Sequence, residues 1–251
     1  MEVHHHPDLH HKKKNFKEYF LEFLMIFLAV TLGFFAESYR EHSVNKSHEK
    51  EYANSFYKDL QDDQKNLPEL INNIQEEQLQ PARSLPVLFA KTNISDPADS
   101  IYFYLRRFIR QQGIRAYITD RTYEQIKNAG EMRLITNKQI ANSLIDYYKD
   151  IVLIDYLQQT LLGYKAKLLE NLPLIFRSAD YALAIDSLDH AIIPHVHVYL
   201  LNTDPVVVNR IVIEINDIGA LSHTIKREIE EVLRKNNEIK KLIANNYNVE
   251  K

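Results

Sequence analysis

Histidines are the residues of this sequence whose type and spacing most readily suggest chemistry. Neutral imidazole rings bind Zn, Ni and Cu, and two groups of histidines are candidate ligands. A defined site also needs fixed geometry, which a flexible tail supplies poorly, and the second group has no acidic partner at a recognisable ligand spacing and no His-Glu-x-x-His helix. For the first group, the alternative is a solvated tail. The first group contains His4, His5, His6, His10 and His11, and the second contains His190, His195 and His197.

The other common catalytic signatures are missing from the sequence. It has no phosphate-binding glycine loop, no Gly-x-Ser-x-Gly elbow and no cysteine. Without cysteine the chain has no disulfide and no thiolate metal site. Its net charge of −3 gives no overall field that attracts nucleic acid. We therefore expect a non-enzymatic protein without a cofactor and without a nucleic-acid partner.

A polar and aromatic segment at 120–148 could form a binding surface. Residues 121–123 and Arg133 could line a ligand pocket. The alternative is structural: Gly130 ends one helix in the left-handed conformation, and Thr136 or Asn137 starts the next. The structural interpretation is the one we favour.

Basic residues also gather beside aromatic ones between positions 102 and 115. A nucleic-acid surface would need such a patch, but the chain as a whole is acidic, so we expect an intramolecular charged face. The basic residues are Arg106, Arg107, Arg110 and Arg115.

The elements that must position these groups begin with an apolar run. Residues 19–36 read YFLEFLMIFLAVTLGFFA, with one charge, Glu22, and no proline. As a helix the run would be roughly 27 Å long, close to the bilayer hydrocarbon thickness of about 30 Å. We predict a transmembrane helix over 19–36. A cleaved signal peptide and a buried soluble helix are the alternatives.

Flanking charges set the expected orientation. Lys12, Lys13, Lys14 and Lys17 precede the run, whereas the basic residues after it are spread among acids. Because cytoplasmic flanks are enriched in Lys and Arg, residues 1–18 are expected to form a cytoplasmic tail. Residues 37–251 would then form an extracytoplasmic helical domain. In a bacterium with two membranes the anchor would lie in the inner membrane and the domain in the periplasm.

Heptad patterns predict three long helices, at about 37–79, 137–171 and 205–245. Pro68 is expected to kink or restart the first, and Pro81 and Pro86 to end it. Gln158 and Lys165 weaken a seam of the second helix, and Gly219 interrupts the third. Asp96, followed by Pro97, predicts a shorter helix to about Gln112. Residues 174–203 are hard to assign: 178–188 are typical of a helix, and 191–202 of a helix or an extended piece.

The seam of the 205–245 helix can pack in two ways. Antiparallel packing within the chain is one, and a homodimer or higher oligomer is the other. Asn236 could set the register of an assembly or face solvent. The seam consists of Ile211, Ile215, Ile218, Ile225, Ile229, Val232, Asn236, Ile239 and Ile243.

Several motifs resemble a known family. The Lys-rich tail with EVHHH is followed by FKEYFLEFLMIFLAVTLGFFAES, EKEYANSFYKDLQDD and RTYEQIKNAGEMRLITNKQIANSLIDYY. Their order is similar to that of single-span helical proteins with a domain of unknown function, common in Bacteroidetes. The resemblance covers the first 80 residues and about 118–150. It implies an inner-membrane anchor with a helical domain, and no activity or catalytic residue.

These observations favour one fold class: all-α, with an N-terminal transmembrane helix followed by an elongated helical bundle with coiled-coil-like long helices. Long periodic helices without a catalytic constellation favour a membrane-anchored interaction or scaffold protein. Its expected partners are the lipid bilayer and either a second copy or another membrane or periplasmic protein. The alternatives are an extracytoplasmic ligand sensor acting through a separate transducer and a histidine-dependent metal-binding protein.

Overall fold

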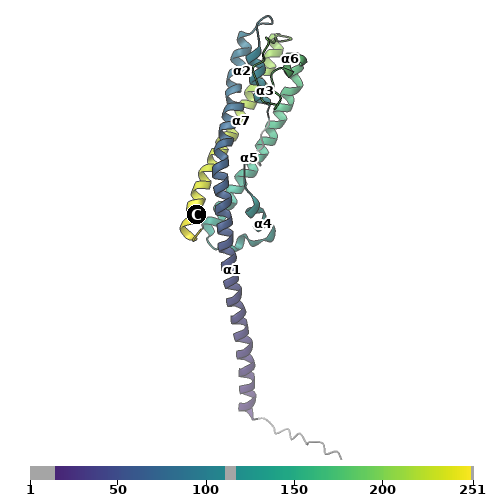
Figure 1. The fold of residues 1–251 in the computed structure, drawn as a ribbon. Coiled ribbons are helices and arrows are strands. Elements are labelled where there is room, and N and C mark those ends of the chain that lie inside the picture. Colours follow the sequence, from purple (N-terminus) through teal and green to yellow (C-terminus); the bar gives the residue numbers. More distant parts are fainter. Residues whose placement is uncertain (1–14, 111–116, 250–251) are drawn as a thin grey trace, which may run out of the picture. The chain divides into compact units, whose positions relative to one another are not determined.

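The computed structural model describes residues 15–110 and 117–249 of the 251-residue chain, and it confirms the predicted all-α class. Within these residues no β-strand is formed, and two isolated bridges join Phe176 to Leu200 and Ile185 to Ala191. The chain divides into two units, residues 1–49 and 50–251. Helix α1 (Phe16–Ile74) contributes to both (Figure 1).

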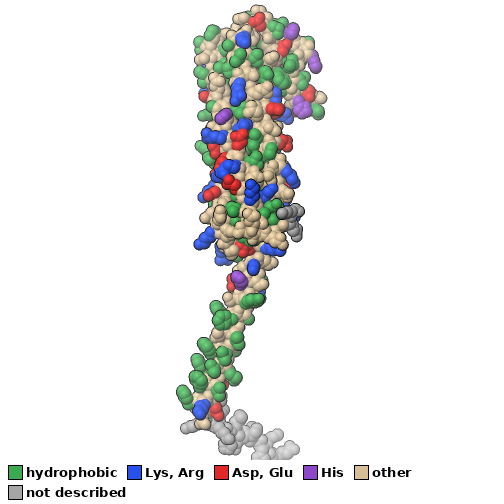
Figure 2. Space-filling model, turned by 90° about the vertical axis from the view of Figure 1, so that its left-hand side faces the viewer, with side chains coloured by type: hydrophobic (Ala, Val, Ile, Leu, Met, Phe, Trp, Pro, Cys, Tyr) green, Lys and Arg blue, Asp and Glu red, His purple; other side chains and the backbone are tan. Residues whose placement is uncertain are grey.

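The described part of the first unit consists almost entirely of the N-terminal portion of α1. Its most apolar 18-residue window is long and apolar enough to cross a membrane, and none of the window is buried. On the face seen in Figure 2, hydrophobic side chains cover this part of the helix. The predicted helix over 19–36 is therefore present, and its apolar side chains do not belong to a protein core.

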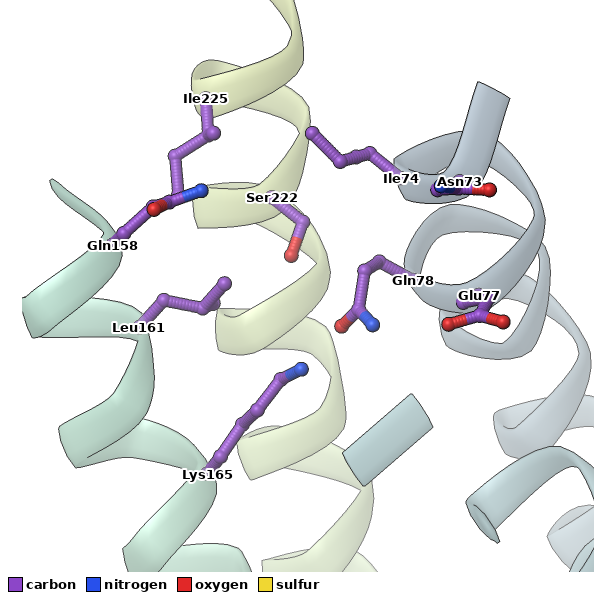
Figure 3. A pocket seen from close by; sticks show the side chains of 9 residues that line it. All are labelled: Asn73, Ile74, Glu77, Gln78, Gln158, Leu161, Lys165, Ser222 and Ile225. Carbon is purple, nitrogen blue, oxygen red and sulfur yellow. The ribbon is translucent and has the colours of Figure 1, made fainter. Parts of the chain in front are cut away.

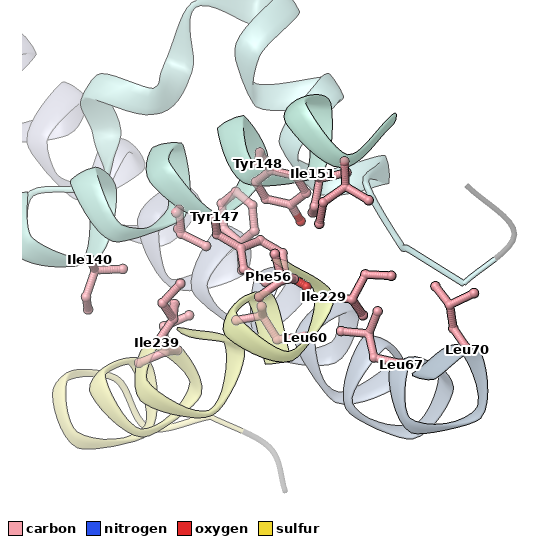
Figure 4. Packing of buried hydrophobic residues seen from close by; sticks show 14 of the residues in the cluster. Phe56, Leu60, Leu67, Leu70, Ile140, Tyr147, Tyr148, Ile151, Ile229 and Ile239 are labelled. Atoms are coloured by element: carbon pink, nitrogen blue, oxygen red, sulfur yellow. The ribbon is translucent and has the colours of Figure 1, made fainter. Parts of the chain in front are cut away.

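The second unit is a helical bundle with two hydrophobic clusters. The first cluster joins α1 to α5 (Lys138–Asn171) and α7 (Pro205–Asn246), with side chains such as Phe56, Tyr147 and Ile229 (Figure 4). The second joins α7 to α2 (Gln80–Lys91) and α3 (Asp99–Ile109). Figure 1 shows α5 and α7 running side by side. The bounds of α5 and α7 agree with the predicted helices at 137–171 and 205–245.

The predicted seam of α7 is buried within one chain. Its members pack in both clusters of the second unit, so no apolar seam of α7 remains open for a second copy. A homo-oligomer would have to use another surface. The buried members are Ile211, Ile215, Ile218, Ile225, Ile229, Val232, Asn236, Ile239 and Ile243.

The prediction that Pro81 and Pro86 end the first long helix is wrong. Helix α1 runs through Pro68 without a break to Ile74, a π-helical turn η1 (Gln75–Leu79) follows, and α2 continues to Lys91. In η1 the Gln80 N–H donates to the Gln75 carbonyl, five residues back. Pro81 then falls in the first turn of α2, where a missing N–H is tolerated. The widened turn thus carries the chain past a proline that would otherwise stop it.

Local caps fix the starts of the other helices. The Asp204 carboxylate accepts from the Val206 and Val207 N–H groups at the start of α7. Asn137, rather than Thr136, caps α5. Gly130, at φ +69°, ends α4 (Arg121–Ala129) as predicted, and the 3-10 turn η3 (Glu131–Leu134) follows.

Two predictions for shorter segments need correction. Helix α3 begins at Asp99 with Ala98 as its N-cap, because the Asp96 carboxylate instead accepts from the Asn93 backbone and side chain. The helix ends at Ile109, and the predicted end at Gln112 lies outside the described residues. In the segment from 174 to 203, the 3-10 turn η4 (Leu172–Leu174) leads to a short α6 (Ser178–Ala182), and the predicted helix does not continue to 188.

Candidate functional site

The candidate site is a small cavity with polar and apolar side chains in its lining, where the end of α1, η1, α5 and α7 meet. Its volume is about 30 Å³. Figure 3 shows side chains from these elements directed toward it. A cavity of this size has room for a water molecule and excludes a metabolite-sized ligand. Its lining residues are Asn73, Ile74, Glu77, Gln78, Gln158, Leu161, Lys165, Ser222 and Ile225.

The π turn brings one wall of the cavity into place. An α-helix repeats every 3.6 residues, and a π turn inserts an additional residue, which changes the direction of the side chains that follow. Here Gln78 and Leu79 are the buried residues of η1. The Gln78 amide therefore faces the core, between buried Leu70 of α1 and buried Leu85 of α2 in the chain.

Lys165 supplies the cationic group of the site. The residue is only 2% exposed, and its ammonium donates to the Arg110 carbonyl at 2.7 Å. Burial lowers the pKa of Lys165 to about 8, and the nearby Glu77 carboxylate partly opposes this shift. An amine of this kind exchanges its proton closer to neutrality than an exposed lysine does.

Two further buried groups in the cavity lack a hydrogen-bond partner within the described chain. Gln78 donates through Nε2 to the Arg110 carbonyl at 3.4 Å, while its Oε1 has no partner. The Ser222 hydroxyl, on a residue that is 1% exposed, has none either. Leaving such groups unsatisfied costs about 1–3 kcal/mol each, so the cavity is a local departure from the best-packed core.

A second polar cluster lies in the core between α1, α5 and α7. Asp63 is fully buried; its carboxylate accepts from the Thr119 N–H at 2.7 Å and from the Tyr147 hydroxyl at 2.7 Å. Desolvation raises the pKa of Asp63 to about 6, and the two hydrogen bonds oppose that rise. Asn236, on the α7 seam, donates to the Leu60 carbonyl at 3.0 Å. Asn236 is thus a buried polar contact within the chain and does not face solvent.

The structure does not bring the predicted histidines together as a metal site. His197 Nδ1 lies 2.8 Å from an Asp99 carboxylate oxygen, and His190 Nδ1 lies 3.1 Å from Asp186. His195 is exposed. Among the residues that the structure describes, no group of three or more His, Cys, Asp or Glu side chains could hold a metal ion. The tail histidines His4, His5, His6, His10 and His11 lie outside the described residues.

The other polar segments are occupied by contacts within the bundle. The Thr122 N–H donates to buried Asp59, and the ring of Tyr123 stacks on Tyr148 at 4.1 Å. Together with the Gly130 and Asn137 caps, these contacts agree with the structural interpretation of this segment.

The described arginines of the basic patch also have intramolecular partners. Arg106 donates to the Tyr181 carbonyl and lies over the Tyr181 ring. Arg107 pairs with Glu76 at 3.5 Å and Arg110 with Glu77 at 3.7 Å. Arg115 lies outside the described residues. These pairs form the expected intramolecular charged face.

The sequence pattern marks part of this cavity. Gln158 and Lys165 occupy seam positions of α5, and Ser222 is buried seven residues from both Ile215 and Ile229 of the α7 seam, so polar residues interrupt two packed faces. Gln78 carried no such signal, because a π turn that changes the helix phase is not visible in a heptad pattern.

Comparisons with known proteins return no match. No protein-family model, no curated protein and no solved structure is significantly similar to this chain.

Proposed function

We propose that this chain is a single-pass membrane protein that holds a helical interaction domain at a bilayer surface, without a catalytic role. The observation that carries the proposal is the exposed apolar window of α1. Burying one large apolar side chain is favourable by roughly 1.5–3 kcal/mol. Exposing all the apolar side chains of this window to water would therefore be strongly unfavourable. Insertion into lipid removes this surface from water. The exposed side chains include Phe20, Phe23, Met25, Ile26, Phe27, Leu28, Val30, Leu32, Phe34 and Phe35.

For orientation, we propose that the N-terminal tail is cytoplasmic and the bundle extracytoplasmic. The lysines that precede the span support this direction, since Lys and Arg are enriched on cytoplasmic flanks. The resemblance to single-span helical proteins of Bacteroidetes is in keeping with an inner-membrane position and a periplasmic bundle.

The absence of cysteine makes a clean topology experiment available. Single cysteines introduced as Lys14→Cys and Lys149→Cys would each be the only thiol of the protein. In intact cells, a membrane-impermeant maleimide should label Lys149→Cys, and Lys14→Cys only after the inner membrane is opened. The reverse pattern would refute the proposed orientation, and labelling of both in intact cells would refute the span.

The interaction role rests on the architecture of the bundle. Most of its large apolar side chains pack inside the bundle, but Val152, Leu153 and Tyr156 of α5 are exposed. We expect the full-length protein, crosslinked in native membranes and purified in mild detergent, to carry a stoichiometric partner or a second copy. A monomer without partners, from crosslinked membranes, would count against a scaffold role.

The second candidate function, an extracytoplasmic sensor, is supported by the polar cavity beside the π turn. Because the cavity is about 30 Å³ and contains the Lys165 ammonium, a stimulus acting there would be a proton or water. Hydrogen exchange of residues 74–80 in the full-length protein, compared at pH 6.5 and 9 after correction for the intrinsic rate, tests this. Unchanged protection would remove the support for a sensor.

A further inference from the structure

The cavity between η1, α5 and α7 brings together three side chains that are each at least nine-tenths buried. Lys165 is 2% exposed, Gln78 is 8% exposed and Ser222 is 1% exposed. They come from three different elements, and in Figure 3 their polar ends are directed into the same space. No membrane span or partner is needed to explain this arrangement, so it is independent of the proposed anchoring role.

We propose that this cavity is a binding site for one ordered water molecule, which bridges Gln78, Ser222 and Lys165. The volume of about 30 Å³ exceeds the roughly 10–15 Å³ that a single water needs. Buried waters in proteins typically make about three hydrogen bonds, which is the number of polar side chains that converge here.

The hydrogen-bonding capacities of the three groups select water over other small ligands. Gln78 Oε1 is an acceptor and needs a donor, which a halide or other anion without hydrogen cannot supply. The ammonium of Lys165 has three N–H groups, and one of them is directed to the Arg110 carbonyl. A metal cation would be repelled by this ammonium. Water donates two hydrogen bonds and accepts two, so it satisfies all three groups.

The orientation of the Gln78 amide is fixed by its other contact. Its Nε2 faces the Arg110 carbonyl at 3.4 Å. Rotating the amide by 180° would place Oε1 against that carbonyl, setting two acceptors together. The acceptor of Gln78 therefore remains on the cavity side, and the requirement for a donor persists.

The water also explains how a charged lysine is tolerated at this depth. Around the ammonium, Glu77 from η1 is the other titratable group that lines the cavity, and Arg110 approaches with its backbone carbonyl. A bound water adds a dipole that can turn toward the ammonium or the free amine. The bound water thus solvates the Lys165 amine in the interior of the bundle.

A substitution with a matched control tests the proposal by the sign of its effect. In the full-length protein in detergent, Ser222→Ala removes a hydrogen-bond partner of the water, and Ser143→Ala on α5 makes the same change in a helix away from the cavity. If water is bound, Ser222→Ala should lower Tm by about 2–4 °C relative to Ser143→Ala. If the cavity is dry, removing an unsatisfied hydroxyl stabilises the bundle, and an equal or higher Tm for Ser222→Ala overturns the proposal.

A second measurement uses the unmodified chain. In the full-length protein with ¹⁵N-labelled glutamine side chains, the Nε2 protons of Gln78 should show a cross-relaxation signal at the water frequency. In Ser222→Ala this signal should be weaker. Exposed Gln125 and Gln139 side chains provide the reference for surface water. A Gln78 signal that is resolved and lacks water cross-relaxation in the unmodified protein overturns the proposal, whatever the Tm values.

Discussion

Gly219 of α7 lies so close to α2 that a Cβ on Gly219 would be 2.7 Å from the Cβ of Ala82. The glycine that interrupts the heptad pattern thus leaves space that the Ala82 methyl group of α2 occupies. Gly163 of α5 is also within a helix, but a Cβ there would meet nothing within 4 Å. The two glycines have the same local propensity and different surroundings.

The first prediction contrasts these glycines. Glycine inside a helix is less favourable than alanine by about 0.8–1 kcal/mol, so Gly163→Ala should raise Tm. Gly219→Ala gains the same propensity but forces α2 and α7 apart, at a cost of about 1–3 kcal/mol, and should lower Tm. Thermal unfolding followed by circular dichroism measures both.

The double variant Gly219→Ala with Ala82→Gly is the control for this contact. It removes the opposing methyl group and should recover part of the lost Tm. If Gly219→Ala alone raised Tm as much as Gly163→Ala, the close approach of α2 and α7 would be wrong.

The second prediction concerns the pH dependence caused by Asp63. Because the pKa of folded Asp63 is raised to about 6 from 3.8, the folded state binds more protons than the unfolded state between these values. The contribution of Asp63 to stability is therefore fully present below pH 3.8 and decreases as pH rises to about 6. Asp63→Asn should remove this decrease, and denaturant unfolding between pH 4 and 7 measures it.

Asp62→Asn is the matched control, since Asp62 is half exposed and pairs with Lys65 at 3.7 Å. This variant should keep the pH dependence of the unmodified protein. If Asp63→Asn and Asp62→Asn behaved alike, the Asp63 carboxyl would not titrate as described.

The third prediction concerns Lys165. Its pKa is lowered to about 8 from 10.5, so the unfolded state binds more protons than the folded state between these values. Stability should therefore rise with pH from about 8, and Lys165→Met should remove the rise. Burial raises the pKa values of Tyr147 and Tyr148, which act in the opposite direction at higher pH, so the measurement is restricted to pH 7.5–9.5.

Exposed Lys167 on the same helix provides the control as Lys167→Met. This change should leave the slope of stability against pH unaltered. A flat profile for the unmodified protein in this range would contradict the buried position of the Lys165 amine.

The fourth prediction concerns the segment that follows α6. Asp99 Oδ1 accepts from the Val198 N–H at 2.9 Å, and the Val198 carbonyl accepts from the Ala98 N–H at 2.8 Å. These bonds join residues almost a hundred positions apart. Asp99→Ala should therefore increase amide exchange at 196–200 by about tenfold with little effect on α5, whereas Asp96→Ala should affect only residues 92–97. Equal exchange in both variants would show that Asp99 does not hold this segment.

The long helices could be predicted because their signals are local. Asp204 before Pro205, Asn137 before Lys138 and the spacing of seam residues specify α5 and α7 without reference to the rest of the chain. Pro81 was misleading because its effect depends on the π turn before it. The 174–203 segment could not be assigned, because contacts such as the Phe176–Leu200 bridge and the Arg106–Tyr181 bond are distant in sequence.

The candidate site could be predicted only in part, because its side chains come from segments that are distant in sequence. Polar residues within the heptad patterns, Gln158, Lys165 and Ser222, mark a break in the core, but their mutual proximity depends on how α5 and α7 pair. The inward direction of Gln78 depends on the π turn. Residue type alone made the histidines metal-ligand candidates, whereas in the structure His190 and His197 have separate acidic neighbours, Asp186 and Asp99.

The most direct test of the central claim is carbonate extraction of membranes that contain the full-length protein, with the intact mass of the recovered protein measured. Permanent anchoring by the α1 apolar window predicts that the protein stays in the membrane pellet and that its mass includes residues 1–36 apart from removal of the initiator Met. Leu28→Arg, which places a charge near the centre of the span at a cost of about 2.5–3.5 kcal/mol, should shift protein to the soluble fraction, whereas Leu188→Arg on the exposed part of the bundle should not. Recovery of the unmodified protein in the supernatant, or of a product that has lost residues 1–36, would contradict the account.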